Sequence, residues 1–463
     1  MNSANGMRAA ALSALVALGC GTLSAETVGW RTNWTGSYPQ ADPPTQWGPD
    51  KGVVWKCAMP NWSNASPVIV GDKLFVTAEP DVLICVSKAD GKILWQKANP
   101  SLDALPEAER AATQKALDEA KGLLGERDHL EKEARGLQRK ARNDPAAKTQ
   151  LDELQKKLGD LNGKLKPVEA FLLPRTHGDN GYSSPVPVCD GKLVGCLFGV
   201  GTVAVFDLEG NRKWIKALGR PHHDWGTSTS PILSGGKLIV HYANQLIGFD
   251  PETGTEAWKT PLGSCWATPT PLTLGGTDLI VTARGEFVRS SDGKVLAKGL
   301  SRNEYNGALI VDGIAYFIDE SNGAKALQLP ATAAEPFQPK ELWATPVKKE
   351  RYYASPVHHD GLLYAITRYG FMTILDAKTG AEVATKDFKA DGGSGQPFYP
   401  SICIAGKYLV FASEHGKTFV LEPGKEFKEV SRNDLEPTKA TPVFEGNKIY
   451  LRGKSNLYCL GAL

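Results

Sequence analysis

The chain repeats itself, and this periodicity constrains its fold more than any other feature of the sequence. A Ser/Thr-Pro-aliphatic signature recurs, and most copies are followed shortly by glycine and an alternating apolar run. The clear copies begin at Ser66, Ser184, Ser230, Thr270, Ser355, Tyr399 and Thr441, and a weaker copy without proline begins at Asn306. From the second copy onward the prolines are 46, 40, 85, 44 and 42 residues apart, and the longest interval holds the weaker copy. The sequence therefore contains eight units.

Each unit has room for four short strands rich in β-branched and aromatic residues, separated by glycine turns. At this period the pattern predicts an all-β fold, an eight-bladed β-propeller of four-stranded blades. The last unit is short by one strand, and residues 53–57 offer the missing one. We therefore expect an N-terminal strand to close the ring and remove an exposed sheet edge. Closure would place Cys57 and Cys459 on neighbouring strands, where a disulfide or two buried free thiols would fit.

The segment from Asp103 to Val168 interrupts the repeat. It contains no aromatic residue and no cysteine, and 27 of its 66 residues are charged. From Ala147 to Leu165 apolar residues are spaced 4, 3, 4, 3 and 4 apart, as at the seam of two packed helices. Pro145 suits the first turn of the second helix. We expect an inserted antiparallel helical hairpin, a coiled coil, whose charges are either a solvated face or a surface that docks a protein partner.

The N-terminus has the pattern of an export signal, in which Arg8 precedes an apolar run and a small residue, Ala25, ends the segment. We expect residues 1–25 to be a signal peptide cleaved after Ala25. The alternative is lipidation at Cys20, the one route by which we expect membrane attachment. The predicted parts are therefore the signal peptide, a closing strand and first blade (26–102), the hairpin (103–168) and the remaining blades (169–463). The protein is expected to be exported, in the periplasm or outside the cell, and possible envelope association follows from the lipidation alternative.

The overall charge argues against a nucleic-acid partner. The chain has 53 basic and 51 acidic residues, so its net charge is +2. Such a balance creates no strong field to attract a phosphate backbone. A protein partner, bound through the hairpin or a propeller face, is the expectation instead.

A second motif, Asp-x-x-Thr-Gly-x-x-x-Trp, is complete from Asp250 to Trp258 and partial elsewhere. It resembles the repeat of the PQQ-like (quinoprotein-type) β-propellers, and in character the chain is nearest to exported BamB-like scaffold propellers. The resemblance implies that the motif residues are structural and that the tryptophans pack between blades. These residues are Trp95, Trp214, Asp250, Gly254, Trp258, Asp376 and Gly380.

The resemblance implies a ligand- or protein-binding module, or an assembly module, in the cell envelope. The alternative is a PQQ-dependent oxidoreductase with calcium, whose site would lie on the loop face near His177 and His223. Many alcohol-oxidising members carry two adjacent cysteines, which this sequence lacks, and no calcium ligands can be placed in it. We therefore expect no cofactor and keep PQQ with calcium as the alternative.

Candidate ligand-binding residues lie in the loops that lead into the innermost strand of each unit. His177 and His223 each stand eight residues ahead of a repeat proline, so we expect them at equivalent places on neighbouring blades. Such loops could bind a polar ligand, or their side chains could simply order the loops through hydrogen bonds. We assign no catalytic and no metal-binding residue. The candidates are His177, Asp179, His223, Asp224, Trp225, Trp266, Arg302, Glu304, Tyr305, Arg351 and Tyr352.

Overall fold

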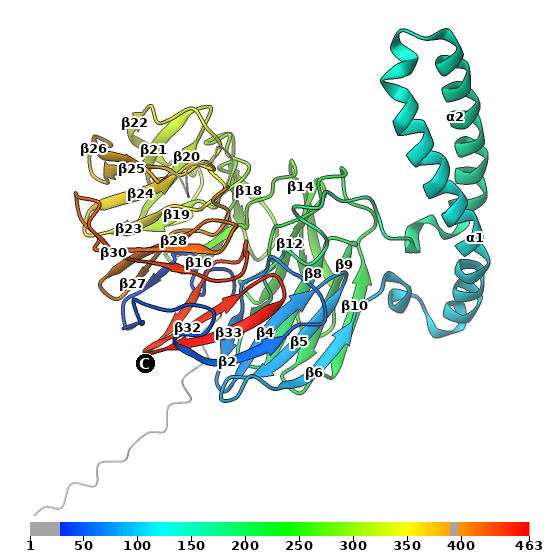
Figure 1. Cartoon of the computed structure of the whole chain (residues 1–463). Coiled ribbons are helices and arrows are strands. Elements are labelled where there is room, and N and C mark those ends of the chain that lie inside the picture. The colour runs from blue at the N-terminus through cyan, green and yellow to red at the C-terminus, as the bar shows by residue number, and fades with distance from the viewer. Residues whose placement is uncertain (1–27, 389–396, 463) are drawn as a thin grey trace, which may run out of the picture.

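The structure is a computed structural model in which residues 28–388 and 397–462 are described. The expected signal peptide and Cys20 lie outside the described residues. Within the described ranges, eight separate sheets, antiparallel except for one short parallel pair, are arranged as the blades of a ring (Figure 1). The prediction of an all-β, eight-bladed propeller is confirmed.

Each blade is numbered in chain order, and its strands run from the channel outward. The first two blades are β3 (Val68–Val70), β4 (Lys73–Ala78), β5 (Val82–Ser87) and β6 (Ile93–Ala98), then β7 (Val188–Cys189), β8 (Leu193–Phe198), β9 (Thr202–Asp207) and β10 (Arg212–Ala217). The third and fourth are β11 (Ile232–Ser234), β12 (Lys237–Tyr242), β13 (Gln245–Phe249) and β14 (Glu256–Pro261), then β15 (Thr270–Leu274), β16 (Thr277–Val281), β17 (Phe287–Arg289) and β18 (Val295–Ala297).

The second half of the ring continues the same order. The fifth and sixth blades are β19 (Leu309–Val311), β20 (Ile314–Asp319), β21 (Gly323–Gln328) and β22 (Lys340–Thr345), then β23 (Val357–His359), β24 (Leu362–Ile366), β25 (Phe371–Asp376) and β26 (Glu382–Asp387). The seventh and eighth are β27 (Cys403–Ala405), β28 (Tyr408–Ala412), β29 (Lys417–Leu421) and β30 (Glu429–Asp434), then β31 (Val443–Glu445), β32 (Lys448–Arg452) and β33 (Asn456–Gly461).

Two N-terminal strands complete the ring. β2 (Val53–Ala58) pairs antiparallel with β33 and supplies the outer strand of the eighth blade, as expected. β1 (Ser37–Tyr38) pairs parallel with β27. Cys57 lies opposite Leu457, and Cys459 lies opposite Trp55, so the two cysteines are offset in register. The disulfide alternative is wrong, because all cysteines of the described ranges are free and these two are buried.

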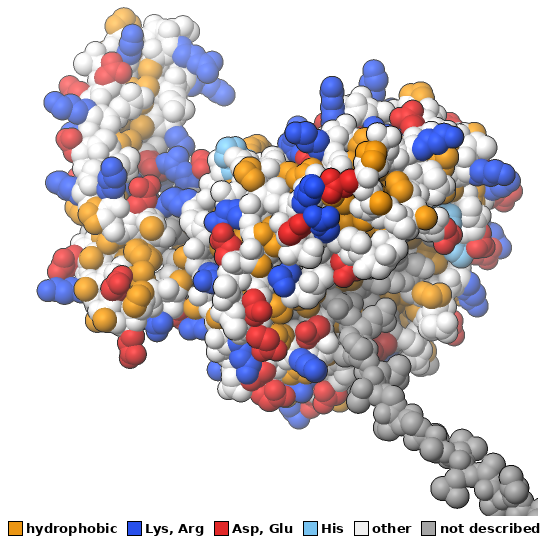
Figure 2. Space-filling view, turned by 180° about the vertical axis from the view of Figure 1, so that it is seen from behind, with side chains coloured by type: hydrophobic (Ala, Val, Ile, Leu, Met, Phe, Trp, Pro, Cys, Tyr) orange, Lys and Arg blue, Asp and Glu red, His pale blue; other side chains and the backbone are white. Residues whose placement is uncertain are grey.

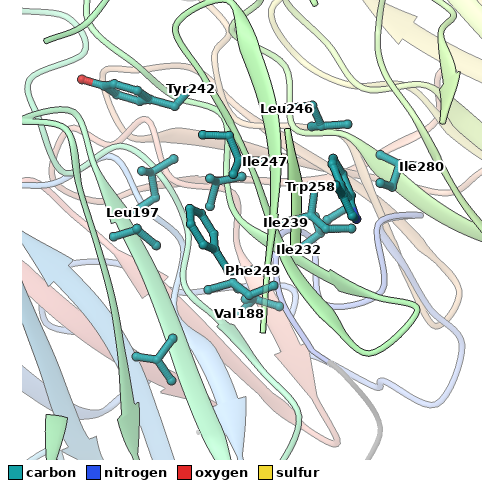
Figure 3. Packing of buried hydrophobic residues seen from close by; sticks show 14 of the residues in the cluster. Val188, Leu197, Ile232, Ile239, Tyr242, Leu246, Ile247, Phe249, Trp258 and Ile280 are labelled. Atoms are coloured by element: carbon teal, nitrogen blue, oxygen red, sulfur yellow. The ribbon is translucent and has the colours of Figure 1, made fainter. Parts of the chain in front are cut away.

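Apolar side chains fill the space between neighbouring blades. Figure 3 shows one such cluster, in which Val188, Ile232, Phe249, Trp258 and Ile280 from the second, third and fourth blades meet. Their exposed fractions are 8% or less. Burial of a large apolar side chain stabilises the folded state by about 1.5–3 kcal/mol, so these seams hold the ring together.

The tryptophan and the turn glycine of the Asp-x-x-Thr-Gly-x-x-x-Trp motif, complete or partial, join neighbouring blades at five seams of the described ring. The carboxylate of Asp250 accepts hydrogen bonds from the backbone N–H and the hydroxyl of Thr253, which fixes the turn before Gly254. The indole N–H of Trp214, in the preceding blade, donates to the carbonyl of Pro251 at 2.9 Å. Its ring lies so close that a Cβ on Gly254 would be 2.6 Å from it. Trp55, Trp95, Trp258 and Trp343 dock on turn glycines of the following blade in the same way.

Hydroxyl groups join neighbouring blades at five of the seams around the central channel. We call the residue two before each inner strand the clasp residue of its blade. The clasp residues are Ser66, Val186, Ser230, Thr268, Gly307, Ser355, Ser401 and Thr441. Backbone N–H groups donate to hydroxyls at 2.9–3.1 Å from Val186 to Ser230, Ser230 to Thr268, Gly307 to Ser355, Ser355 to Ser401, and Ser401 to Thr441. The Ser or Thr of the repeat is therefore an acceptor between blades.

The clasp residues correct the register of three clear sequence copies and of the weaker one. In the seventh blade the copy at Tyr399 is two residues early, because Ser401 accepts the hydrogen bond, and the weaker copy at Asn306 is one residue early. In the second blade the copy at Ser184 is two residues early, because Val186 is the clasp residue and Pro187 follows it. In the fourth blade the copy at Thr270 is two residues late, because Thr268 accepts the hydrogen bond. Both blades contain two adjacent X-Pro pairs, so the sequence offered two equivalent alignments.

The inserted segment forms two long helices that stand beside the ring (Figure 1). They are α1 (Glu107–Gln138) and α2 (Pro145–Leu165), with short 3-10 turns η1 (Ser101–Ala104), η2 (Lys140–Arg142) and η3 (Lys166–Phe171) around them. The carboxylate of Asp144 caps α2 by accepting from the N–H of Ala146, and Pro145 is its first residue. An ion pair of 2.7 Å between Arg212 and Asp103 fixes the hairpin to the second blade. Neither helix of the described part of the chain is apolar enough over a sufficient length to cross a membrane.

Candidate binding site at the channel mouth

All eight blades contribute to one cavity at the mouth of the central channel. The cavity has a volume of about 320 Å³. Each blade supplies the residue two before its clasp residue, which we call the mouth residue. The mouth residues are Asn64, Ser184, Ser228, Trp266, Tyr305, Tyr353, Tyr399 and Lys439, and all of them line the cavity. Because the blades repeat the same geometry, each blade places its mouth residue around the same opening.

The N-terminal segment supplies the floor of this cavity. Trp30 lines it from below, although it belongs to none of the eight blades. The adjacent Arg31 is 1% exposed, and its guanidinium donates to the carbonyls of Pro356 and Ile402 at 3.0 and 2.7 Å. A Cβ on Gly307 would lie 2.9 Å from the Trp30 ring, which explains why the fifth blade has glycine as its clasp residue.

Aromatic rings stack around the mouth in two groups. In the first, His223 stacks on Trp266 at 4.9 Å, and Trp266 stacks on Tyr305 at 5.4 Å. In the second, Tyr353 and Tyr399 are nearly parallel, with ring centroids 4.8 Å apart. An edge contact between Tyr305 and Tyr353 joins the two groups. The stacking holds these side chains in fixed positions, so the mouth is preorganised.

Lys439 and the carboxylate of Asp179 complete the wall, and Glu414 lies next to them in a neighbouring cavity. Lys439 binds the carboxylate of Asp179 at 2.8 Å and lies 3.7 Å from Glu414. The ammonium also lies over the ring of Tyr399, 4.6 Å from its centre. The hydrogen bond from Lys439 holds the pKa of Asp179 below its usual range, whereas burial raises the pKa of Glu414. Asp179 is therefore an ionised partner of Lys439 at neutral pH.

The structure brings five of the candidate residues to the cavity wall. They are Asp179, Trp225, Trp266, Tyr305 and Arg351. His177 and His223 lie behind this wall, stacked on Trp225 and Trp266 respectively. Their sequence offsets differ, because His177 stands nine residues ahead of its clasp residue and His223 seven. Their local arrangement is the same, because Nδ1 of each accepts from the backbone N–H two residues further on and each ring stacks on a tryptophan from the entry loop of the next blade.

The other candidates lie away from the cavity. Arg302 and Glu304 line a neighbouring cavity between the fourth, fifth and sixth blades, where Glu304 is paired with Arg284. Tyr352 also borders that cavity, but it is 2% exposed and packs in the blade core. Asp224 is exposed beside His223. Tyr353, one residue along the extended chain from Tyr352, faces the mouth instead.

Sequence reasoning missed Trp30, Tyr399 and Lys439. The signal for the last two is their position, two residues before the clasp residues Ser401 and Thr441. Trp30 had no such signal, because its place depends on how the N-terminal segment crosses the channel.

A partly buried thiol near the mouth has the wrong protonation state for a nucleophile. The sulfur of Cys265 lies 3.5 Å from Nδ1 of His241. Burial raises the pKa of the Cys265 thiol to about 12 and lowers the pKa of His241 to about 4. Both groups are therefore neutral at pH 7, and the pair is structural rather than a thiolate with an imidazolium.

Comparisons with known proteins agree with this architecture. The family described as outer membrane protein assembly factor BamB matches residues 40–131 and 199–424. No curated protein matches the sequence at a significant level.

Solved structures share the fold at low sequence identity. BamB from Moraxella catarrhalis has a TM-score of 0.55 and 11% identity, over 89% of this chain and 99% of that one. A europium-containing methanol dehydrogenase has a TM-score of 0.54 and 11% identity, over 91% and 88%. The quinohemoprotein alcohol dehydrogenase ADHIIG from Pseudomonas putida HK5 has a TM-score of 0.50 and 11% identity, over 90% and 75%. At this identity the likenesses show the fold alone, which hosts both enzymes and non-enzymes.

Proposed function

This chain belongs to the PQQ-like β-propeller family described as outer membrane protein assembly factor BamB, and from that premise we propose that it is a binding module of the cell envelope. Its ligand site is the channel mouth. The observation that carries the proposal is the mouth cavity itself, to which every blade contributes a side chain and which Trp30 closes from below. A concave, preorganised site with aromatic and polar walls is the usual form of a binding pocket.

The residues at the mouth argue against the oxidoreductase alternative. Calcium takes six to eight oxygen ligands, several of them from carboxylates. Among the described lining residues Asp179 is the sole carboxylate, and Lys439 already neutralises it. Nowhere in the described ranges do three His, Cys, Asp or Glu side chains gather in a way that could hold a metal ion. The donor set therefore does not fit a calcium-bound quinone.

The hairpin is proposed as a second docking surface. It projects beside the ring, and both of its helices carry charged side chains of both signs (Figures 1 and 2). The loop that leaves the hairpin also carries Asp179 to the mouth, and Arg175 in that loop is paired with Glu131 of α1. A partner held by the hairpin would therefore lie next to the mouth. Deletion of residues 103–168 should leave a folded ring that no longer captures the partner, and unchanged capture would contradict this part of the proposal.

Site-specific photo-crosslinking in living cells tests the mouth as the ligand site. A photoreactive phenylalanine analogue would replace Trp225 or Tyr305 at the mouth in the full chain. The matched control is Val430, an apolar residue on the outer strand β30 that is 38% exposed. We expect adducts from the two mouth positions and none from Val430. Equal adducts at all three positions, or none at the mouth, would overturn the proposal.

A further inference from the structure

The mouth cavity is the middle of a longer trough. A cavity of about 460 Å³ between the fourth, fifth and sixth blades shares Tyr305 with it. On the other side, a cavity of about 490 Å³ shares Asn64, Asp179 and Lys439 with it. Three cavities with common walls cross the face of the ring in sequence. Such a site suits an extended chain rather than one small compact molecule.

Both faces of Trp266 and of Tyr399 are already occupied, whereas Trp225, which is 55% exposed, stacks on His177. Trp266 lies between His223 and Tyr305, and the guanidinium of Arg351 lies 5.3 Å from the centre of the Tyr305 ring. In the second stack, Tyr399 lies between Tyr353 and the Lys439 ammonium. These rings therefore present their edges to the cavity, and the edge of an aromatic ring is its positive part.

Occupied faces decide between classes of extended ligand. Single-stranded nucleic acids bind such proteins by stacking bases on free aromatic faces. A sugar ring likewise needs a free face to lie against. Positive ring edges instead favour oxygen atoms with negative charge, as in peptide carbonyls and carboxylates. A polypeptide is the extended chain that fits this lining.

Two guanidinium groups converge on the hydroxyl of Tyr353, of which Arg351 lines the mouth cavity and Arg368 is not among the lining residues. Arg351 and Arg368 each approach the hydroxyl oxygen of Tyr353 to 3.5 Å. The nearest carboxylate to Arg351 is Glu320, at 3.7 Å. Within the described ranges Arg368 has no carboxylate partner, and its Nε is buried without a hydrogen bond. Glu320 is therefore the one carboxylate of the described ranges paired with these two cations, and guanidinium groups bind carboxylates through paired hydrogen bonds.

We propose that the trough binds an extended acidic segment of a partner protein, with a carboxylate of that segment held by Arg351 and Arg368 beside Tyr353. This inference rests on the proposed function and names the chemistry of its partner. The segment runs across the mouth between the two flanking cavities, and its backbone carbonyls face the ring edges of Trp266, Tyr305 and Tyr399.

Selection from a phage-displayed library of random peptides, each about ten residues and about 33 Å long when extended, tests the inference on the full chain. The selected peptides are then titrated against Arg351→Gln and Arg368→Gln by fluorescence anisotropy. The matched control is Arg139→Gln, an exposed arginine of the hairpin. Urea unfolding of each variant establishes that the ring is intact.

We expect the selected peptides to be enriched in Asp and Glu, and each mouth variant to weaken their binding at least about tenfold, with no change for Arg139→Gln. The acidic inference would be overturned if the selected peptides showed no acidic enrichment and bound the arginine variants as tightly as the wild type. If the same peptides lost binding to Tyr399→Ala, the mouth would remain the ligand site. If no peptide binds, the inference is also overturned, and the crosslinking experiment decides the proposed function separately.

Discussion

Replacement of Gly254 by alanine tests whether the tryptophan motif holds neighbouring blades together. Gly254 has a φ of +71°, and a Cβ there would lie 2.6 Å from the Trp214 ring of the preceding blade. A left-handed backbone costs a non-glycine residue about 1–2 kcal/mol. Displacement of the indole adds an overpacking cost of about 1–3 kcal/mol. The free energy of unfolding of Gly254→Ala should therefore fall by about 2–5 kcal/mol.

A glycine of the same blade gives a matched control. Gly236 has a φ of +68°, but a Cβ at this position would have no neighbouring atom within 4 Å, so Gly236→Ala should carry only the backbone cost. Urea unfolding followed by circular dichroism measures both losses. In a Trp214→Leu background the extra cost of Gly254→Ala should largely disappear, because the two residues are in contact. Equal losses for Gly254→Ala and Gly236→Ala in the wild-type background would refute the reasoning.

Three further predictions concern the N-terminal segment, a buried carboxyl and the thiols. Arg31→Met removes the donor to two buried carbonyls, so the free energy of unfolding measured by urea denaturation should fall by about 2–4 kcal/mol. Arg139→Met on the hairpin is the control and should leave this free energy unchanged. A loss below about 1 kcal/mol for Arg31→Met would show that the N-terminal segment is not anchored by this side chain. Burial raises the pKa of Glu79, so the folded state keeps its proton to higher pH, and stability should fall as pH rises from the ordinary glutamate pKa of 4.5 to the raised pKa of the folded state. Glu79→Gln should lose this slope, and a constant difference between the two proteins over that range would contradict it. After unfolding without reductant, Cys57 and Cys459 should both react with a maleimide; a disulfide-linked peptide containing the two would contradict the register of β2 and β33.

The blade count and the closing strand could be predicted because they depend on local patterns that repeat. Turn glycines, β-branched runs and the missing strand of the eighth blade are all visible in the chain itself. The register of the second and fourth copies could not be predicted, since each of these blades offers two X-Pro pairs and the choice is set by a hydrogen bond shared with the third blade.

The candidate site was predicted in part for a related reason. His177 and His223 were candidates because imidazoles bind ligands, but both lie behind the cavity wall. The side chains that face the mouth are instead determined by their position relative to the clasp residue. The floor of the mouth cavity depends on Trp30, which precedes all eight blades in the sequence and belongs to none of them. Its place follows from the path of the N-terminal segment across the channel, which no local pattern records.

Titration of the full chain with pyrroloquinoline quinone, with and without calcium, tests the central claim that this ring is a binding module rather than a quinone-dependent oxidoreductase. Heat release and the absorbance of the quinone would be followed together. Because the mouth offers one carboxylate, already paired with Lys439, we predict no stoichiometric binding and no effect of calcium. Tight binding of one quinone per chain that requires calcium would contradict the account and identify the mouth as a cofactor site.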